Sequence, residues 1–298
     1  MNPVRSGVVL VDKTSGPSSF EIVRLVRRNA RVSRVGHTGT LDPLAEGLLA
    51  VCIGEACKLV PFLQDAVKKY EVRIALGVET ETLDWEGEPV RRAPVPSLDR
   101  SAVEAVLTGF TGRISQVPPI FSAVKQDGMQ LYRKARRGEA VEPAPREVTV
   151  ESISLSELEA ETMTLTVACH KGTYIRSLAR DIARALGTLG TVDRLKRTAC
   201  SGFVLENTVS VDELGRGMDI ASHIIPMPDA LPLMPKHVID ETAEAVVRNG
   251  GCAPLPTQPI PFADPERPLV ALLNGDRRLV AIARQQENGL QPVRVMLE

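Results

Sequence analysis

The most constraining feature of this chain is a glycine-punctuated loop over residues 34–47, Arg-Val-Gly-His-Thr-Gly-Thr-Leu-Asp-Pro-Leu-Ala-Glu-Gly. Its three glycines permit tight turns and a close approach of the backbone to a ligand. Pro43 fixes its own backbone and biases the preceding Asp42 away from helical angles. The apolar run Gly-Leu-Leu-Ala-Val-Cys-Ile follows at once and predicts a buried strand. We therefore expect a rigid scaffold to present Asp42 at a defined position on a loop.

The bulk composition allows one large domain or two, because 298 residues with 43% apolar content can form a substantial core. No apolar run reaches the roughly 20 residues that span a bilayer, and the N-terminus lacks the apolar stretch of a signal peptide. We therefore expect a cytoplasmic protein without membrane contact. The five cysteines are scattered without a Cys-x-x-Cys pair and the four histidines are isolated, so we predict no metal site.

Positive charge is gathered locally, although the net charge of the whole chain is only -1. Ser18 and Glu21 form a capping box that predicts a helix to about Arg31, with Phe20, Val23 and Val26 on one face. Another face of this helix carries a stripe of arginines at i, i+3, i+4 and i+7: Arg24, Arg27, Arg28 and Arg31. The stripe indicates either contact with RNA phosphates or an ordinary solvated surface.

The remaining pattern mixes hairpins with helices. Strands are predicted at Gly7–Val11, Tyr70–Leu76, Val148–Leu155 and Met163–Cys169, and helices at about Leu98–Thr108 and from Thr173 to a C-cap at Gly187. The acidic, turn-rich segment Thr80–Pro96 is expected at the surface. The basic segment Lys125–Arg146 suits either a clamp on a polyanion or a helical hairpin.

The C-terminal part is predicted as a separate small module. Prolines between Pro226 and Pro235 suggest a linker. Beyond it we expect a helix at about Asp240–Arg248 and strands near Leu269–Leu273, Leu279–Ala283 and Val293–Leu297. The chain has no Gly-x-Gly-x-x-Gly or P-loop motif. We predict an α+β fold, with a large mixed, mainly antiparallel sheet, flanking helices and a small β-rich C-terminal domain.

The loop also carries a family resemblance. Gly-His-Thr-Gly-Thr-Leu-Asp-Pro-Leu-Ala-Glu-Gly-Leu-Leu resembles the signature of the TruB family, the bacterial tRNA pseudouridine-55 synthases. The resemblance covers about residues 7–205, and the last 63 residues match only by position. It implies a pseudouridine synthase catalytic domain over residues 1–235, with a basic insertion at about 118–146 that closes over the tRNA T arm. Residues 236–298 would form a PUA-like RNA-binding domain.

The resemblance implies an isomerase that converts the uridine at position 55 of the T-loop to pseudouridine by base flipping, without a cofactor. Asp42 would be the essential residue, acting at C1′, on the C2′ proton or on the uracil ring. Arg176, in Lys-Gly-Thr-Tyr-Ile-Arg, would pair with Asp42 and keep it ionised. Tyr70 would stack on the uracil, and its hydroxyl would help to remove the C5 proton.

Several further residues are expected to contact RNA or support the site by the same resemblance. His37 would insert into the gap left by the flipped base, with proton transfer as its competing role. Lys13 would support the site, although Thr14 stands where the family usually has proline. Leu195 would pack at the floor of the site. The remaining expected RNA contacts are Tyr174, Arg24, Arg28 and Lys125, whereas Arg180 and Arg184 are expected to be ordinary surface arginines.

Three other functions remain open at this stage. The first is an RNA-binding module or tRNA chaperone without chemistry, which would need no combination of Asp42, Tyr70 and Arg176. The second is a glycoside or nucleoside hydrolase that uses Asp42 with a distant second acid. The third is the subunit of a guide-RNA-directed pseudouridylation complex. We expect a monomer that binds the tRNA T arm.

Overall fold

The computed structural model describes residues 6–122, 124–126, 128–139, 141–262, 264 and 266–297. The chain divides into two units, which are described here one at a time. The first unit comprises Met1–Leu41, Leu48–Asp65 and Ser201–Glu298, and the second unit comprises Asp42–Gly47 and Ala66–Cys200. Asp42 and the rest of its short turn therefore belong to the second unit.

The strands of the first unit are β1 (Gly7–Lys13), β2 (Val35–His37), most of β3 (Glu46–Ile53), β13 (Phe203–Val204), β14 (Val209–Ser210), β15 (Lys236–Val238), β16 (Leu269–Leu273), β17 (Leu279–Gln286) and β18 (Gly289–Val295). Its helical segments are α1 (Ser19–Ala30), η1 (Gly54–Leu59), α2 (Val60–Leu63), α6 (Val211–Gly215), η2 (Ala221–His223) and α7 (Glu241–Arg248).

The strands of the second unit are the start of β3, β4 (Lys68–Leu76), β5 (Val78–Thr80), β6 (Pro89–Arg92), β7 (Gly112–Gln116), β8 (Lys125–Gln126), β9 (Met129–Gln130), β10 (Arg146–Leu158), β11 (Thr162–Cys169) and β12 (Gly190–Cys200). Its helices are α3 (Arg100–Thr108), α4 (Leu131–Arg136) and α5 (Ile175–Ala185). Among its described residues, the basic insertion thus holds a short hairpin and one helix rather than a helical hairpin.

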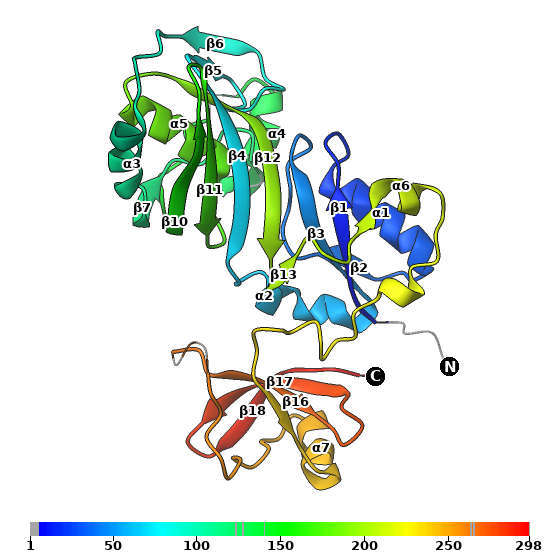
Figure 1. Ribbon diagram of the computed structural model, residues 1–298. Helices are drawn as coiled ribbons and strands as arrows, with labels where there is room; N and C mark the ends of the chain where they lie inside the picture. The colour runs from blue at the N-terminus through cyan, green and yellow to red at the C-terminus, as the bar shows by residue number, and fades with distance from the viewer. Residues whose placement is uncertain are drawn as a thin grey trace. The chain divides into compact units, whose positions relative to one another are not determined.

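Most strands belong to one mixed sheet in the order β14-β1-β3-β12-β4-β11-β10-β7, with β2 beside β3 and β13 beside β12. The pairs β1–β14 and β3–β12 are parallel, whereas β12–β4, β4–β11, β11–β10 and β10–β7 are antiparallel. The predicted mixed, mainly antiparallel sheet is confirmed. In the second unit α5 packs on β12 and β4, and α3 contacts both β10 and α5 (Figure 1).

The alternation predicted for Tyr70–Leu76 is confirmed in β4, where buried and more exposed residues alternate along the strand. Tyr70, Val72, Ile74 and Leu76 form the buried set. Because successive side chains of a strand point to opposite faces, these four side chains share one face of the sheet. The long neighbouring strand β12 was not predicted, since its charged stretch Arg-Leu-Lys-Arg hides the alternation.

Helix α1 begins with the predicted capping box, in which Ser18 accepts from the Glu21 amide and Glu21 accepts from the Ser18 amide. Its buried face consists of Ile22, Val23 and Val26 together with Ser19. Phe20 was expected on that face, but the residue is 62% exposed. The expectation was wrong because a step of about 100° per residue places Ile22, not Phe20, beside Val26.

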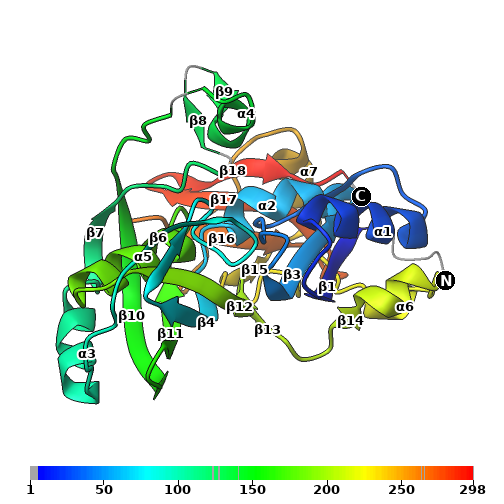
Figure 2. The ribbon, with the colours of Figure 1, turned by 90° about the horizontal axis from the view of Figure 1, so that it is seen from above.

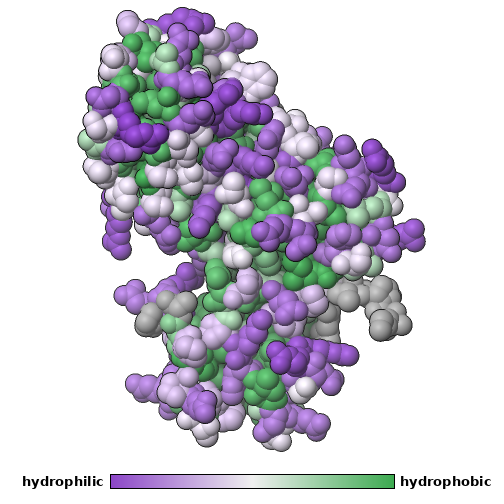
Figure 3. Space-filling view, in the orientation of Figure 1, coloured by the Kyte–Doolittle hydropathy of each residue, from purple (hydrophilic) through white to green (hydrophobic). Residues whose placement is uncertain are grey.

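The C-terminal residues form the expected β-rich module, a four-stranded sheet of order β15-β16-β17-β18 with α7 beside it. Asp240 caps α7 by accepting a hydrogen bond from the Ala243 amide at 2.8 Å. The module has its own apolar core, which includes Val247, Val270, Leu272 and Leu290. The predicted last strand starts earlier, at Gly289. Figure 3 shows apolar residues among polar ones on its outer surface, and Val238 and Val246 are among the exposed ones.

One surface expectation was wrong in part. Within Thr80–Pro96, the residues Thr80, Leu83 and Asp84 are buried. The Thr80 hydroxyl donates to the Asp84 carbonyl at 2.6 Å, and the Asp84 carboxylate pairs with Arg176 of α5 at 3.2 Å, so these buried polar groups have partners. Within the stretch 226–235, where the prolines suggest a linker, Met227, Ala230 and Leu231 are buried. Among the described residues, no helix is both long and apolar enough to cross a membrane.

Candidate active site

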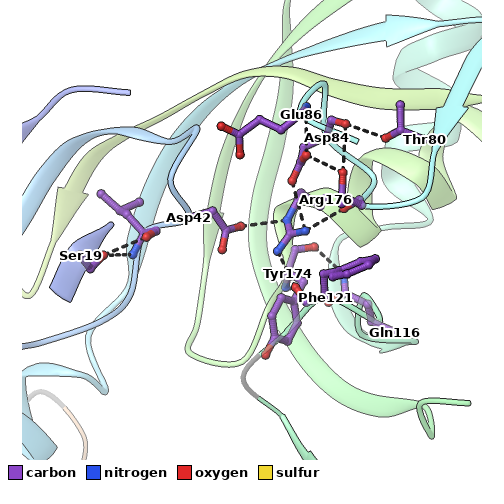
Figure 4. A network of polar contacts seen from close by, with 11 residues as sticks. Ser19, Asp42, Thr80, Asp84, Glu86, Gln116, Phe121, Tyr174 and Arg176 are labelled. Carbon is purple, nitrogen blue, oxygen red and sulfur yellow. Dashed lines mark hydrogen bonds and ion pairs between the residues drawn. The ribbon is translucent and has the colours of Figure 1, made fainter. Parts of the chain in front are cut away.

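The loop that carries Asp42 is held on both sides. Leu41, the residue before it, donates its amide to the hydroxyl of Ser19 and accepts from that hydroxyl, both at 2.8 Å (Figure 4). After it, the Ala45 amide donates to the Asp42 carbonyl at 3.1 Å. Gly47 closes the turn with φ 94°, and a Cβ there would lie 2.3 Å from the Arg197 carbonyl oxygen. Only glycine fits this position, so the turn is tightly defined.

Arg176 is the second residue of α5 and the centre of the polar network in Figure 4. Its Nε lies 2.8 Å from Oδ2 of Asp42, and its Nη1 lies 3.2 Å from Oδ2 of Asp84. The guanidinium also donates to the carbonyls of Thr82 at 2.7 Å and Phe121 at 3.1 Å. The side chain is only 5% exposed, whereas that of Asp42 is 35% exposed. The buried cation is therefore fixed from three sides, and the carboxylate remains accessible to a substrate.

Asp84 is the residue that the sequence reasoning missed. Its carboxylate accepts from the Thr82 hydroxyl at 2.6 Å and from the Glu86 amide at 3.2 Å, both at Oδ1. Its other oxygen faces Arg176, so both oxygens have protein partners. The signal that was available in the sequence is Thr-Glu-Thr-Leu-Asp, since a threonine two residues before an aspartate favours a local side-chain bond. The acids that surround it predict a solvated segment instead.

The charges in this network sum to a net negative value, with two carboxylates on one guanidinium. Burial raises the pKa of Asp84, while the hydrogen bond from Thr82 and the charge of Arg176 oppose this and the charge of Asp42 adds to it. A buried carboxylate of this kind is less favourable in its ionised form than it is in water. Keeping Asp84 ionised in this position therefore costs free energy of folding. Its contact with Arg176 indicates that it orients the guanidinium.

We expect Asp84→Asn to lower kcat by at least about tenfold without lowering the thermal stability at pH 7. The amide of asparagine offers only one acceptor oxygen, so it can accept from Arg176 or from the Glu86 amide but not from both. In either orientation the guanidinium loses the negative charge that anchors it. Arg176 keeps Asp42 and two carbonyls, so no charge is left unpaired. Because the pKa of Asp84 is raised on folding, its ionisation removes stability as the pH rises above 3.8.

The difference in unfolding free energy between Asp84→Asn and the unsubstituted protein should therefore shift in favour of the variant as the pH rises from acid to neutral. Chemical denaturation at several pH values checks this trend, and single-turnover kinetics checks kcat. A variant of full activity, or one that loses stability most strongly at neutral pH, would contradict this role of Asp84.

The helix that carries Arg176 was predicted correctly in its buried face and its end. Ile175, Leu178, Ala179 and Ile182 are buried, and Gly187 follows the helix with φ 80°. The expectation for Arg180 was wrong, because its side chain is 12% exposed and donates to the Val117 carbonyl at 3.3 Å. Arg184 is 44% exposed but pairs with the buried Glu79 at 2.8 Å.

Tyr70 lies in β4, directly across from Arg197 of β12. Burial raises the pKa of Tyr70 to about 12, while Arg197, which hydrogen-bonds the hydroxyl, acts in the opposite direction. Within the described part of the chain, the ion pairs and hydrogen bonds of Asp42 and Arg176 do not include Tyr70. The structure thus joins two of the three expected catalytic residues directly, and it holds Tyr70 on the buried face of the same unit.

Leu195 lies two residues before Arg197 and opposite Val72, so it shares the face of Tyr70. It is 6% exposed. Tyr174 is half-buried at the N-cap position of α5, and burial raises the pKa of its hydroxyl. The side chain of Lys125 lies outside the described part of the chain.

The other expected RNA contacts lie in the first unit. His37 ends β2 and accepts a hydrogen bond from the Gly39 amide at Nδ1, 3.2 Å away. Lys13 is 1% exposed and donates to the Thr14 carbonyl at 3.0 Å, so its burial favours a supporting role over phosphate contact. Arg24 and Arg28 are exposed on α1. Arg28 also lines a hollow of about 1200 Å³ together with Arg31 and Arg34.

Among the described residues, no group of three or more His, Cys, Asp or Glu side chains is placed to hold a metal ion. What the site can do chemically rests on the accessible carboxylate of Asp42 beside a buried cation. Such a carboxylate serves as a nucleophile or a base.

Residues 27–175 match the family model described as TruB family pseudouridylate synthase, N-terminal domain. The tRNA pseudouridine synthase B of Cupriavidus metallidurans is 40% identical over 295 residues, 97% of this chain and 94% of the relative. That of Xanthomonas campestris pv. campestris is 42% identical over 248 residues, 82% of this chain and 80% of the relative. Among solved structures, a chain in the crystal structure of a Cbf5-Nop10-Gar1 complex has a TM-score of 0.76 and 26% identity, covering 99% of this chain and 85% of that chain.

Proposed function

Because this chain belongs to the TruB family of pseudouridylate synthases, we propose that it isomerises the uridine at position 55 of the tRNA T-loop. The proposal rests most on one observation, the accessible Asp42 carboxylate 2.8 Å from the buried Arg176 guanidinium. Both residues lie where the family motifs predict them, and neither is needed for binding alone.

The reaction rearranges bonds within one nucleotide. The bond between C1′ and N1 breaks, the uracil turns while bound, and a bond between C1′ and C5 forms. C5 then loses a proton, and N1 ends with one. Atoms and electrons balance within the substrate and its protons, so the isomerisation itself requires no redox partner. Asp42 acts at C1′, at the C2′ proton or on the ring, and all three routes need it ionised.

Arg176 supports the ionised form of Asp42 by its charge and holds the carboxylate in place. We propose that the ring of Tyr70 stacks on the uracil and that its hydroxyl lies beside C5. The phenol is protonated in the free protein at neutral pH, and burial makes its ionisation still harder by raising its pKa to about 12. Deprotonating C5 through this hydroxyl would therefore depend on the positive charge of Arg197 beside it.

The RNA side of the proposal uses base flipping, because the target base is stacked in a folded T-loop. We propose that His37 inserts into the gap that the flipped base leaves in the RNA. The arginine stripe of α1 supplies exposed positive charge for phosphates, as Arg24 and Arg28 are both exposed. Residues 1–235 would be the catalytic domain and residues 236–298 a PUA-like RNA-binding domain. We propose a monomer that acts on the tRNA T arm in the cytoplasm.

A hydrolase that uses Asp42 with a second acid is less well supported. The only carboxylate that we find on the same guanidinium among the described residues is Asp84, and both its oxygens are bonded to protein groups. It has no free oxygen to protonate a leaving group. A guide-RNA-directed subunit is also less favoured, since relatives about 40% identical over nearly the whole chain are named as tRNA enzymes.

The direct test is to incubate an unmodified tRNA transcript with the purified protein alone and to map pseudouridine at single-nucleotide resolution. We expect conversion at position 55 only, without other protein or RNA and without release of free uracil. A transcript with cytidine at that position and an isolated anticodon-arm hairpin serve as control substrates. Free uracil would indicate a hydrolase, and absence of product with tight binding would indicate a binding module. Product at another position would refute the T-loop assignment.

A further inference from the structure

Gln116 makes two hydrogen bonds to Tyr174, the N-cap residue of α5, the helix that carries Arg176. Its side-chain Oε1 accepts from the Tyr174 amide at 2.8 Å, and its Nε2 donates to the Tyr174 carbonyl at 3.1 Å (Figure 4). Gln116 is 2% exposed and is the last residue of β7. The amide thus binds both backbone groups of Tyr174, as a neighbouring strand would.

This contact matters because α5 has no side-chain cap of its own. Tyr174 occupies the N-cap position without a capping hydrogen bond, and the first amides of a helix otherwise lack partners. The Tyr174 carbonyl also accepts the first helical bond, from the Leu178 amide at 3.0 Å. Arg176 lies inside this first turn. The start of the helix, and with it the guanidinium, is therefore held from outside by Gln116.

The residues after Gln116 bind the same two turns of α5. The Val117 carbonyl accepts from the Ser177 hydroxyl at 2.8 Å and from Arg180 at 3.3 Å. The Phe121 carbonyl accepts from Arg176 at 3.1 Å. Five hydrogen bonds therefore join the segment 116–121 to the start of α5. We call this segment the stem, because the basic insertion continues from it.

Two residues that follow the stem, Ser122 and Val124, are bonded to the helix of the insertion. The Tyr132 amide in α4 donates to the Ser122 carbonyl at 3.1 Å, and the Leu131 amide donates to the Val124 carbonyl at 2.8 Å. Helix α4 carries Arg133 and Lys134, which are groups that bind phosphates. Hydrogen bonds thus join the basic helix to Ser122, and the preceding residue, Phe121 of the stem, accepts from Arg176.

We propose that Gln116 is a positioning residue for Arg176, and that it couples the basic insertion to the catalytic ion pair. This inference rests on the proposed function. Gln116 does not touch the substrate; it fixes the first turn of α5 so that Arg176 meets Asp42 in the productive geometry. Small displacements of a catalytic group cost large factors in rate, so this restraint acts on kcat rather than on RNA affinity.

The test is Gln116→Met, which keeps the length of the side chain but removes both polar atoms. The matched control is Thr188→Val, which removes a hydrogen bond from a residue that is 5% exposed, to the Pro94 carbonyl at 2.9 Å, just beyond the other end of α5. We expect Gln116→Met to lower kcat about tenfold with the tRNA Kd changed by less than about twofold. Thr188→Val should lower the melting temperature comparably and leave kcat unchanged.

Two further measurements separate positioning from a general loss of stability. In an Arg176→Lys background, Gln116→Met should cost little additional kcat, because its effect passes through the guanidinium. Hydrogen exchange in the peptide around Leu178 should accelerate in Gln116→Met but not in Thr188→Val.

Equal kcat in Gln116→Met and Thr188→Val, or a loss fully additive with Arg176→Lys, would overturn the inference. So would a loss that appears entirely in tRNA Kd, because that result would make Gln116 an RNA-binding residue. The exchange measurement is independent of turnover. If the unsubstituted protein made no pseudouridine, the proposed function would fail, while unchanged exchange around Leu178 would separately refute the positioning role.

Discussion

Asp42→Asn abolishes pseudouridine formation, with an expected fall in kcat of at least about 10⁴-fold, and leaves tRNA binding intact. The substitution preserves the size of the side chain and removes only its charge, which every route to the product requires. Arg176 keeps Asp84 and two carbonyl partners, so the fold should be little affected. Removing a negative charge beside a polyanion should leave tRNA affinity unchanged or raise it slightly. Single-turnover conversion and a binding titration measure the two effects.

Glu46→Gln is the matched control for this prediction, because Glu46 is another carboxylate of the same loop and lies at the start of β3. It should retain conversion close to that of the unsubstituted protein. Residual conversion by Asp42→Asn at more than about a hundredth of the normal rate would assign the chemistry to another group. Equal losses in the two variants would point to the charge of the loop rather than to one catalytic carboxylate.

Arg176→Met is expected to impair both catalysis and folding, with kcat lower by about 10²-fold to 10³-fold and stability lower by about 3–5 kcal/mol. The substitution leaves Asp84, whose side chain is 6% exposed, without its cation, and it frees Asp42 from its partner. An unpaired buried carboxylate takes up a proton more readily. The stability deficit should therefore shrink as the pH falls, because protonation of Asp84 removes the unpaired charge.

Arg73→Met provides the comparison, because Arg73 in β4 forms an ion pair with Asp193 but its side chain is 43% exposed. Loss of an exposed pair should cost at most about 1 kcal/mol and leave kcat unchanged. Denaturant unfolding at pH 5 and pH 8 distinguishes the two variants. A deficit of Arg176→Met that is independent of pH, or no larger than that of Arg73→Met, would contradict the network around Asp84.

The pairing of Asp42 with Arg176 could be predicted because both residues lie in distinctive motifs. The glycine frame around Asp42 and the segment before Arg176 are readable without knowledge of their neighbours. The structure confirms the ion pair at 2.8 Å. The strand β4 and the face of α5 were also predictable, because their periods of 2 and 3.6 residues are local properties of the sequence.

Asp84 and Gln116 could not be predicted in the same way. Asp84 lies in an acidic turn and Gln116 precedes two prolines, and neither context suggests a buried residue. Each becomes significant only through a distant partner. Asp84 pairs with Arg176, 92 positions later in the chain, and Gln116 bonds Tyr174, 58 positions later. A polar residue is buried when the fold supplies its hydrogen bonds, and a single sequence does not reveal such distant partners.

The amino-acid sequence alone determined the family and the α+β class and predicted Asp42 as the reactive carboxylate, since each depends on short-range patterns of glycine, proline and apolar residues. Only the tertiary structure decided which groups hold Arg176 in place, because that arrangement requires the turn at Thr82–Glu86, the stem and α5 to meet around one guanidinium. The physical reason is that burying a cation demands acceptors from several directions, and no single segment of chain supplies them.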